Sequence, residues 1–300
     1  MTEPRSCAVI FNPTKVADNF NAVAGVRLLA AGYAEPRWLE TTPDDPGYAM
    51  TTEAREAQVD LVVVAGGDGT VRIVAAGLAG TGIPLGIVPA GTGNLLARNL
   101  DLPLEADAAL DVICAGNTHP IDMIVLTVDD HEPHRFMVMA GTGLDAVIMD
   151  ETNDTLKSAI GPAAYFFAAT KAVGRLPVPV RIKVDGHRTH RRRSVICLVG
   201  NVGQLTGGIH LLPAARPDDG LLYVYVASPH RFKHWVKTLL RLITRRPQAD
   251  DHVDVWVGKR VEIELSQPDT YQLDGDVEGE CRRMVAEVDP GSLVVCLPRS

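Results

Sequence analysis

Short hydrophobic runs alternate with longer amphipathic stretches along the first part of the chain. The runs have the length and apolar character of buried strands, and the stretches between them have helical spacing. Strands are expected at Ala8–Phe11, Glu35–Leu39, Leu61–Ala65 and Leu85–Val88, with helices at Ala17–Ala31, Ala49–Gln58, Val71–Leu78 and Gly93–Asn99. Strict alternation of strand and helix is typical of a parallel sheet covered by helices on both faces, a three-layer α/β domain.

The pattern changes from about Ile121, where β-like runs recur with turns between them. These runs are Ile121–Val128, Arg135–Ala140, Val180–Val184, Ser194–Val199, Leu221–Val226, Arg260–Leu265 and Tyr271–Leu273, with two helical insertions at Leu156–Arg175 and His230–Arg246. Hairpin-linked strands of this kind favour an antiparallel β-rich sandwich. We therefore expect an α/β domain over residues 1–122, completed by residues 292–300, and a β-rich domain over residues 123–291.

Composition places the chain among ordinary globular proteins of the cytoplasm. Apolar residues make up 46% and charged residues 22%, and the formal net charge of −8 argues against binding nucleic acid. No apolar run approaches the roughly 20 residues that span a bilayer, and the polar first residues lead directly into a strand. The five cysteines are scattered and lack metal-ligand spacing, which fits a reducing compartment.

The buried run Leu61–Ala65 ends abruptly in Gly66-Gly67-Asp68-Gly69-Thr70, and a helix is expected next. Glycine lets the backbone bend freely and approach a ligand closely. A helix N-terminus offers unpaired N–H groups that suit phosphate. Asp68 would repel phosphate unless a cation lay between them, so the turn predicts a nucleotide bound with Mg²⁺. The alternative is a tight turn with a capping aspartate.

Three other polar turns follow neighbouring strands. They are Asn12-Pro13-Thr14-Lys15, Thr41-Thr42, and Gly91-Thr92-Gly93-Asn94, which comes after Pro89-Ala90. Ligands of parallel sheets bind beyond the carboxyl ends of the strands, so these turns are expected to converge with the first. The first glycine turn matches neither a Walker A loop nor a dinucleotide fingerprint. Lys15 is equally well explained as a solvated surface charge.

A second acidic group, Asp274-Gly275-Asp276, lies far away in the sequence. An Asp-Gly pair at the end of a strand is often only a hairpin turn. Phosphoryl transfer to a hydroxyl, however, requires a carboxylate that accepts or orients the proton and others that hold Mg²⁺. Asp68 alone cannot do both, which favours a catalytic role for the distant turn.

Taken in order, these motifs resemble the diacylglycerol kinase catalytic family, above all its soluble bacterial lipid kinases, which are relatives of sphingosine and ceramide kinases. The glycine-aspartate turn is shared with NAD kinases and phosphofructokinases, whereas the C-terminal half is similar to lipid kinases. Further family-like segments are Ile121-Asp122, Gly141 to Asp145, Lys157 to Tyr165, and Gly207-Gly208 through Pro213-Ala214 to Asp218-Asp219-Gly220.

The resemblance implies an NAD-kinase- or diacylglycerol-kinase-like nucleotide-binding domain, ATP, and specific roles for matching residues. ATP and a catalytic Mg²⁺ would be held by Asn12, Thr41, Gly66, Gly67, Asp68, Gly69, Thr70, Gly91, Thr92, Gly93 and Asn94, with Asp122 in the aspartate–water–Mg²⁺ network. Asp274 would be the base. Asp276 stands where the family usually has glutamate, one methylene longer. A structural Mg²⁺ would bind the Asp219 side chain and backbone carbonyls near Arg216 and Leu221.

The segment His230–Arg246 carries six Lys or Arg residues and no acid, with apolar residues at helical spacing. It is a candidate interfacial helix for an anionic membrane, or else an ordinary helix packed on the β-rich domain. The expected function is an ATP- and Mg²⁺-dependent lipid kinase at the inner face of the membrane, acting on diacylglycerol in a cleft between the domains. The alternatives are an NAD-kinase-like enzyme and a catalytically silent nucleotide-binding regulator. The oligomeric state, a homodimer included, stays open.

Overall fold

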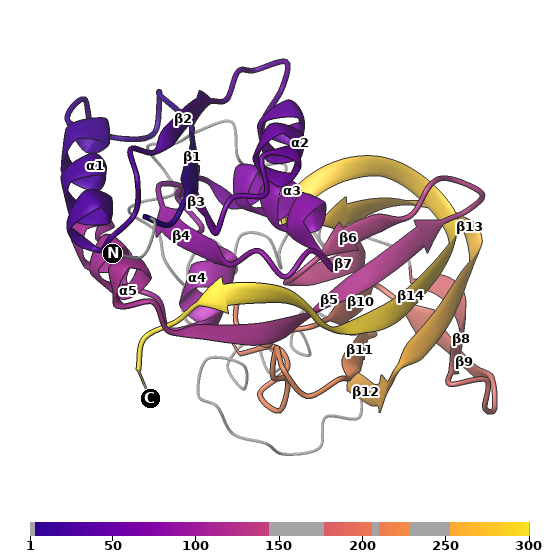
Figure 1. The fold of residues 1–300 in the computed structure, drawn as a ribbon. Helices are drawn as coiled ribbons and strands as arrows, with labels where there is room; N and C mark the ends of the chain where they lie inside the picture. The colour runs from indigo at the N-terminus through magenta and orange to yellow at the C-terminus, as the bar shows by residue number, and fades with distance from the viewer. Residues whose placement is uncertain (1–3, 144–176, 206–209, 229–252, 300) are drawn as a thin grey trace. The chain divides into compact units, whose positions relative to one another are not determined.

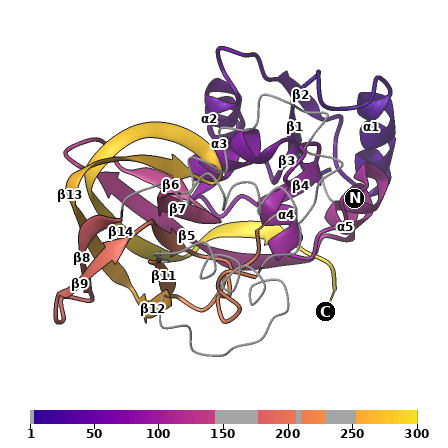
Figure 2. The same cartoon turned by 180° about the vertical axis from the view of Figure 1, so that it is seen from behind.

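The computed structural model describes residues 4–143, 177–205, 210–228 and 253–299 (Figures 1 and 2). The chain divides into two compact units, Met1–Met123 with Pro290–Ser300 and Ile124–Asp289. Strands β5 (Thr118–Val128) and β14 (Asp276–Cys296) contribute residues to both units. The expected helices at 156–175 and 230–246 lie outside the described residues.

Unit 1 is built on a parallel sheet. Its strands are β1 (Cys7–Phe11), β2 (Arg37–Glu40), β3 (Leu61–Gly66) and β4 (Leu85–Pro89), in the order β4-β3-β1-β2, and the end of β14 pairs with β4 through Val295 and Leu85. Every residue of β1, β3 and β4 is buried. Helices cover both faces of such strands, which is why their sequences are continuously apolar instead of alternating.

Helices cover this sheet in two layers (Figure 1). Helices α1 (Phe20–Ala30) and α5 (Ala106–Ala115) share one core with β1 and β3, whereas α2 (Tyr48–Glu56) and α3 (Asp68–Leu78) contact each other and the sheet. The short α4 (Leu95–Asn99) follows β4. The three-layer α/β prediction is confirmed. Helix α5 was not predicted, although Leu110 and Ile113 are completely or almost completely buried at helical spacing.

Unit 2 consists mainly of antiparallel strands around a second core. They are β6 (His134–Phe136), β7 (Met139–Thr142), β8 (Val178–Val184), β9 (His190–Ser194), β10 (Ile196–Gly200), β11 (Leu222–Ala227), β12 (Val253–Gly258) and β13 (Arg260–Leu273). The order is β12-β11-β10-β7-β13-β14, with β8 paired to the first half of β13 and to β9. The predicted antiparallel β-rich domain is confirmed.

Several features of unit 2 differ from the expected strands. The runs Arg260–Leu265 and Tyr271–Leu273 belong to one strand, because β13 continues through a register shift between Glu264 and Asp269. Pro268 lies in that irregular stretch, where a strand tolerates a missing N–H. Strands β9 and β12 were not predicted. Among the described residues, no helix is both long enough and apolar enough to cross a bilayer.

Candidate active site

The carboxyl ends of four parallel strands in unit 1 are held side by side beyond the last strand residues. Three backbone hydrogen bonds join Thr41 to Phe11, Asn12 to Ala65, and Ala90 to Gly66, each with an N···O distance of 2.9 Å. The amide of the first residue in each pair donates to the carbonyl of the second. The turns expected to converge from their sequence positions therefore lie along one edge of the sheet.

The two glycine turns approach each other more closely than side chains would permit. A Cβ atom added at Gly91 would lie 2.7 Å from the Cα atom of Gly67 and 3.0 Å from Oδ1 of Asn94. A Cβ atom at Gly66 would lie 2.9 Å from the Cβ atom of Thr70. Real Cβ contacts are essentially never this short, so the close approach requires glycine at both positions.

Asp68 connects the two turns. Its carboxylate accepts the N–H of Asn94 at 2.8 Å and the N–H of Leu95 at 2.6 Å. Asn94 has a left-handed φ of 49° and precedes α4, while its own side chain bonds to both the N–H and the carbonyl of Gly91. Asp68 thus places a negative charge at the N-terminus of α4. The capping alternative is therefore correct in part, because the carboxylate caps α4 although Asp68 itself lies in the first turn of α3.

Helix α3 begins at Asp68, earlier than the expected Val71. Its first helical hydrogen bond joins the N–H of Val71 to the carbonyl of Gly67 at 3.0 Å, so the amides of Gly69 and Thr70 precede it. Its N-cap residue, Gly67, provides no side-chain cap. Amides at a helix N-terminus bind anions through direct hydrogen bonds and the helix dipole. Of the two helices that follow the glycine turns, α3 is therefore the better suited to phosphate.

Substituting Gly91 and Gly67 separately tests the contact between the turns. Gly91→Ala is expected to lower stability by about 1–3 kcal/mol, the scale of overpacking, because its Cβ meets backbone. Gly67→Ala is expected to be much milder, since its Cβ would lie 3.5 Å from the Cα of Gly91, an ordinary contact. Urea unfolding of both variants measures the difference. Equal losses would contradict the observed geometry.

Asn12 and Asp122 are both engaged within unit 1. Oδ1 of Asn12 accepts the N–H and the hydroxyl of Thr14, which shapes the turn after β1. Asp122 on β5 is 2% exposed and accepts the N–H of Gly291 at 2.8 Å. Among the residues described, no group of three or more His, Cys, Asp or Glu side chains could hold a metal. Mg²⁺ commonly binds one or two carboxylates together with substrate phosphates and water, so the oxygen donors of Asp68 and Asp122 suit its chemistry.

In unit 2, Asp274 is buried and surrounded by backbone donors. The residue is 4% exposed and has a left-handed φ of 48°. Its Oδ1 accepts the N–H of Val138 and of Met139, both at 2.9 Å, and its Oδ2 accepts that of Met137 at 3.2 Å. The expected single strand over 135–140 is split at this point into β6 and β7, and the exposed Asp276 begins β14.

Two amide side chains around this turn were missed at the sequence level. Asn201 is fully buried and supports the interrupted strand, since its Nδ2 donates to the carbonyl of Met137 at 3.1 Å and its N–H to that of Val138 at 3.0 Å. Gln272 is 2% exposed and its Oε1 accepts the N–H of Gly275 at 2.8 Å. Gln272 stands between the apolar Tyr271 and Leu273, and this ordinary strand alternation gave no signal of its burial.

Asp219, expected to bind a structural Mg²⁺, already accepts two hydrogen bonds. Its Oδ1 accepts the N–H of Leu221 at 2.9 Å, and its Oδ2 accepts the hydroxyl of Tyr223 at 2.7 Å. Arg216 forms an ion pair with Asp218 at 3.3 Å. A carboxylate with nearby carbonyls suits a hard cation, so the donor set is compatible with the predicted site.

Burial, and then the hydrogen bond to Asp219, raise the pKa of Tyr223 to about 12. The phenol therefore stays protonated in the folded state while an unfolded tyrosine ionises near pH 10. The stabilisation that the protonated Tyr223 phenol gives to the folded state is complete below about pH 10 and is lost as the pH rises toward 12. Urea unfolding from pH 8 to 11 should show that Tyr223→Phe is less stable at pH 8 by about 1 kcal/mol and that the difference shrinks as the pH rises. A constant difference would contradict the raised pKa.

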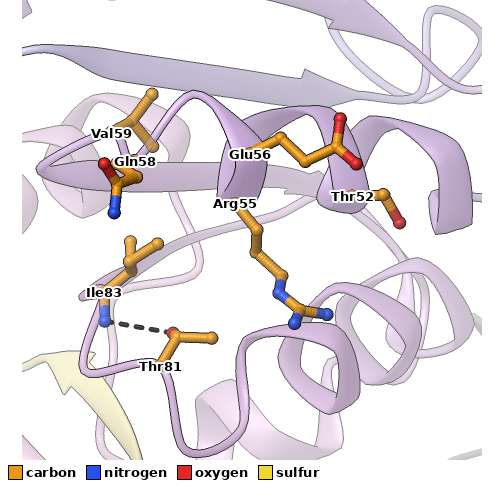
Figure 3. Close-up of a pocket in the computed structure, with 7 residues that line it drawn as sticks. All are labelled: Thr52, Arg55, Glu56, Gln58, Val59, Thr81 and Ile83. Atoms are coloured by element: carbon orange, nitrogen blue, oxygen red, sulfur yellow. Dashed lines mark hydrogen bonds between the residues drawn. The ribbon is translucent and has the colours of Figure 1, made fainter.

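A hollow of about 520 Å³ lies elsewhere on unit 1 (Figure 3). It is lined by Thr52, Arg55, Glu56, Gln58, Val59, Thr81 and Ile83. These residues come from the end of α2 and from the segments that precede β3 and β4. The hollow is therefore at the amino ends of the strands, whereas the glycine turns follow the carboxyl ends, and it is no part of the candidate site.

Comparisons with known proteins agree with both units. The family model described as the diacylglycerol kinase catalytic domain matches residues 6–126, and that of the YegS C-terminal NAD kinase beta sandwich-like domain matches residues 138–297. A Mycobacterium tuberculosis protein named diacylglycerol kinase is 32% identical over 242 residues, covering 80% of this chain and 77% of its own. A Salmonella typhimurium protein named probable lipid kinase YegS is 31% identical over 254 residues, covering 82% and 81%.

Solved structures show the same fold. A Bacillus anthracis structure titled as a diacylglycerol kinase matches with a TM-score of 0.74 at 24% identity, covering 99% of this chain and 98% of that one. Another structure from the same organism matches with a TM-score of 0.80 at 23% identity, covering 99% and 97%.

Proposed function

Because this chain belongs to the diacylglycerol kinase family of lipid kinases, we propose that it uses ATP and Mg²⁺ to phosphorylate the hydroxyl of a neutral lipid, with diacylglycerol as the first candidate. Membership makes the chain a kinase and implies the use of ATP. The observation that carries the proposal is the contact between the two glycine turns, bridged by the carboxylate of Asp68.

At the nucleotide end, the amides of Gly69 and Thr70 would bind phosphate oxygens at the N-terminus of α3. Gly66 and Gly91 would let the phosphates approach the backbone, and Thr41, Thr92 and the other predicted turn residues would line the same edge. Bound Mg²⁺ would neutralise the charge that develops on the transferred phosphoryl group. Asp68 and Asp122 would hold the ion, and its positive charge would offset the repulsion between these carboxylates and the phosphates.

At the acceptor end, Asp274 would orient the lipid hydroxyl and receive its proton. Three N–H donors hold this carboxylate in one position. In a loose phosphoryl-transfer transition state, the nucleophile carries little charge until late, so position matters more than a strong base. Asp276 would then assist from the exposed side of the turn.

We propose further that the lipid is bound by unit 2 and that transfer occurs in a cleft between the two domains. The enzyme would reach its substrate from the surface of an anionic membrane, at the inner face. The segment 230–246, which carries the basic residues expected to meet that surface, lies outside the described residues.

The decisive experiment supplies purified protein with Mg²⁺, labelled ATP and mixed micelles of diacylglycerol, ceramide, sphingosine or a long-chain alcohol. A phosphorylated lipid is expected with at least one of them, and none with any of them would reject the proposal. NAD belongs in the panel because the C-terminal domain is similar to that of NAD kinases. Phosphorylation of NAD alone would favour the NAD-kinase-like alternative.

A second measurement addresses the membrane and the silent regulator. Sedimentation with vesicles containing phosphatidylglycerol, compared with phosphatidylcholine alone, should show binding to the anionic vesicles only. A kinase for a soluble substrate has no reason to bind either. Measurable turnover in the first experiment would exclude a catalytically silent regulator.

A further inference from the structure

The side chain of Gln272 is buried beside the Asp274 turn and uses only one of its two polar atoms. Oε1 accepts the N–H of Gly275 at 2.8 Å, whereas Nε2 is buried and has no hydrogen-bond partner in the part of the chain that the structure describes. The orientation of the carboxamide follows from this bond, because the atom facing an N–H must be the oxygen. Nε2 therefore faces away from the turn as a donor.

An unpaired buried donor costs free energy comparable to a lost hydrogen bond, and most buried polar groups have partners. The neighbours Tyr271 and Leu273 belong to the hydrophobic core of unit 2. Side chains alternate along a strand, so Gln272 faces away from that core. A hydrophobic residue would be less costly at this position unless the donor is used.

The residue beside Gln272 on the neighbouring strand has no side chain that could pair with Nε2. The register partner of Gln272 on β7 is Gly141, which has a φ of +146° and where an added Cβ would lie 2.2 Å from the carbonyl oxygen of Cys197. No side chain therefore extends from Gly141 toward the amide. The result is a neutral donor, adjacent to the peptide between Asp274 and Gly275, beside a position that lacks a side chain.

We propose that Nε2 of Gln272 donates a hydrogen bond to an ester oxygen of the lipid substrate while Oε1 holds the Asp274–Gly275 turn. The proposal rests on the proposed lipid kinase function and deepens it by naming a substrate-binding residue. In diacylglycerol, ester oxygens lie one or two carbons from the hydroxyl that reacts. A donor next to the residue that orients this hydroxyl is placed to bind them. A neutral amide suits an uncharged ester oxygen, whereas phosphate is usually bound by cations or helix starts.

Two variants separate the two roles of Gln272. Gln272→Glu keeps an oxygen for the N–H of Gly275 and loses the donor, and Gln272→Met is of similar length and loses both. With dioctanoylglycerol as substrate, both are expected to lower kcat/KM for the lipid by about tenfold, the value of one hydrogen bond to a buried donor, with the KM for ATP unchanged. Wild-type kinetics in Gln272→Glu, or an equal change in the KM for ATP, would overturn the proposal.

A dialkyl ether analogue of the lipid controls for the charge that glutamate introduces near Asp274. Ether oxygens are poorer acceptors than ester carbonyls, so the wild type should prefer the ester lipid and both variants should lose that preference. A charge effect on Asp274 would instead slow both lipids equally. The absence of any preference in the wild type would overturn the proposal even if a variant failed to fold.

Equilibrium binding of dioctanoylglycerol without ATP separates this proposal from the proposed function. If the wild type phosphorylated no lipid, the kinase proposal would fail, but binding would still test Gln272. About tenfold weaker binding to Gln272→Met would support the inference. Equal binding to both proteins, or none to the wild type, would overturn it.

Discussion

Replacing Asp274 by asparagine is expected to lower kcat for lipid phosphorylation by about 10²-fold or more, the scale of losing a placed acid–base or electrostatic group. The asparagine oxygen can still accept one or two of the three backbone N–H groups, but its NH₂ must then face the remaining one. The variant therefore loses the negative charge at the lipid hydroxyl and leaves a buried donor unpaired. The latter should also lower stability by about 1–3 kcal/mol. Initial rates measured at a temperature well below the unfolding midpoint separate the effect on kcat from the loss of stability.

Asp129 offers a matched control in the same unit. It has the same left-handed φ of 48°, and its carboxylate accepts the N–H groups of Arg282 and Arg283 at 3.1 and 2.8 Å. Asp129→Asn should therefore lose stability without a large change in kcat. An equal fall in kcat in both variants would mean that Asp274→Asn acts through folding. A wild-type kcat in Asp274→Asn would remove Asp274 from the mechanism.

Much of the fold could be predicted because its signals are local. The apolar runs of β1, β3 and β4 reflect strands buried on both faces, and the change of pattern near Ile121 marks the start of the antiparallel strands. Helix α5 and strand β12 have the expected periodicity but were overlooked. The continuity of β13 could not be read in the same way, because its irregular polar stretch resembles a loop between two strands.

The candidate site was predictable only as far as its turns. The glycines and aspartates follow strands directly, so their convergence on one edge follows from the rule for parallel sheets. The contacts that complete each site join residues far apart in the sequence. The carboxylate of Asp68 bonds to an amide 26 residues away, and that of Asp274 to one 135 residues away. Periodicity contains no information about such pairs, and the role of Gln272 is equally hidden.

Asp68→Ala is expected to lower kcat by about 10²-fold or more and to increase the Mg²⁺ concentration needed for half-maximal rate. The physical reason has two parts, because one carboxylate serves both the fold and the proposed ion. Its removal leaves the N–H groups of Asn94 and Leu95 without their acceptor, which should cost about 0.5–2 kcal/mol, as loss of a helix cap does. It also removes a charge that Mg²⁺ requires beside the phosphates. Initial rates over a Mg²⁺ series, together with urea unfolding, measure the two parts separately.

Asp60 is a control that separates the structural role from the Mg²⁺-binding role, since its carboxylate has a comparable structural role without the proposed chemistry. Its carboxylate accepts the N–H of Ser6 at 2.7 Å and the hydroxyl of Ser6 at 2.9 Å. These bonds lie at the amino ends of β1 and β3, away from the glycine turns. Asp60→Ala should lose stability while keeping kcat and the Mg²⁺ dependence. If Asp68→Ala behaved in the same way, its carboxylate would be only the cap of α4, and the phosphates would have to be neutralised by another group. A Mg²⁺ requirement that changes in Asp68→Ala alone would instead assign the ion to this carboxylate.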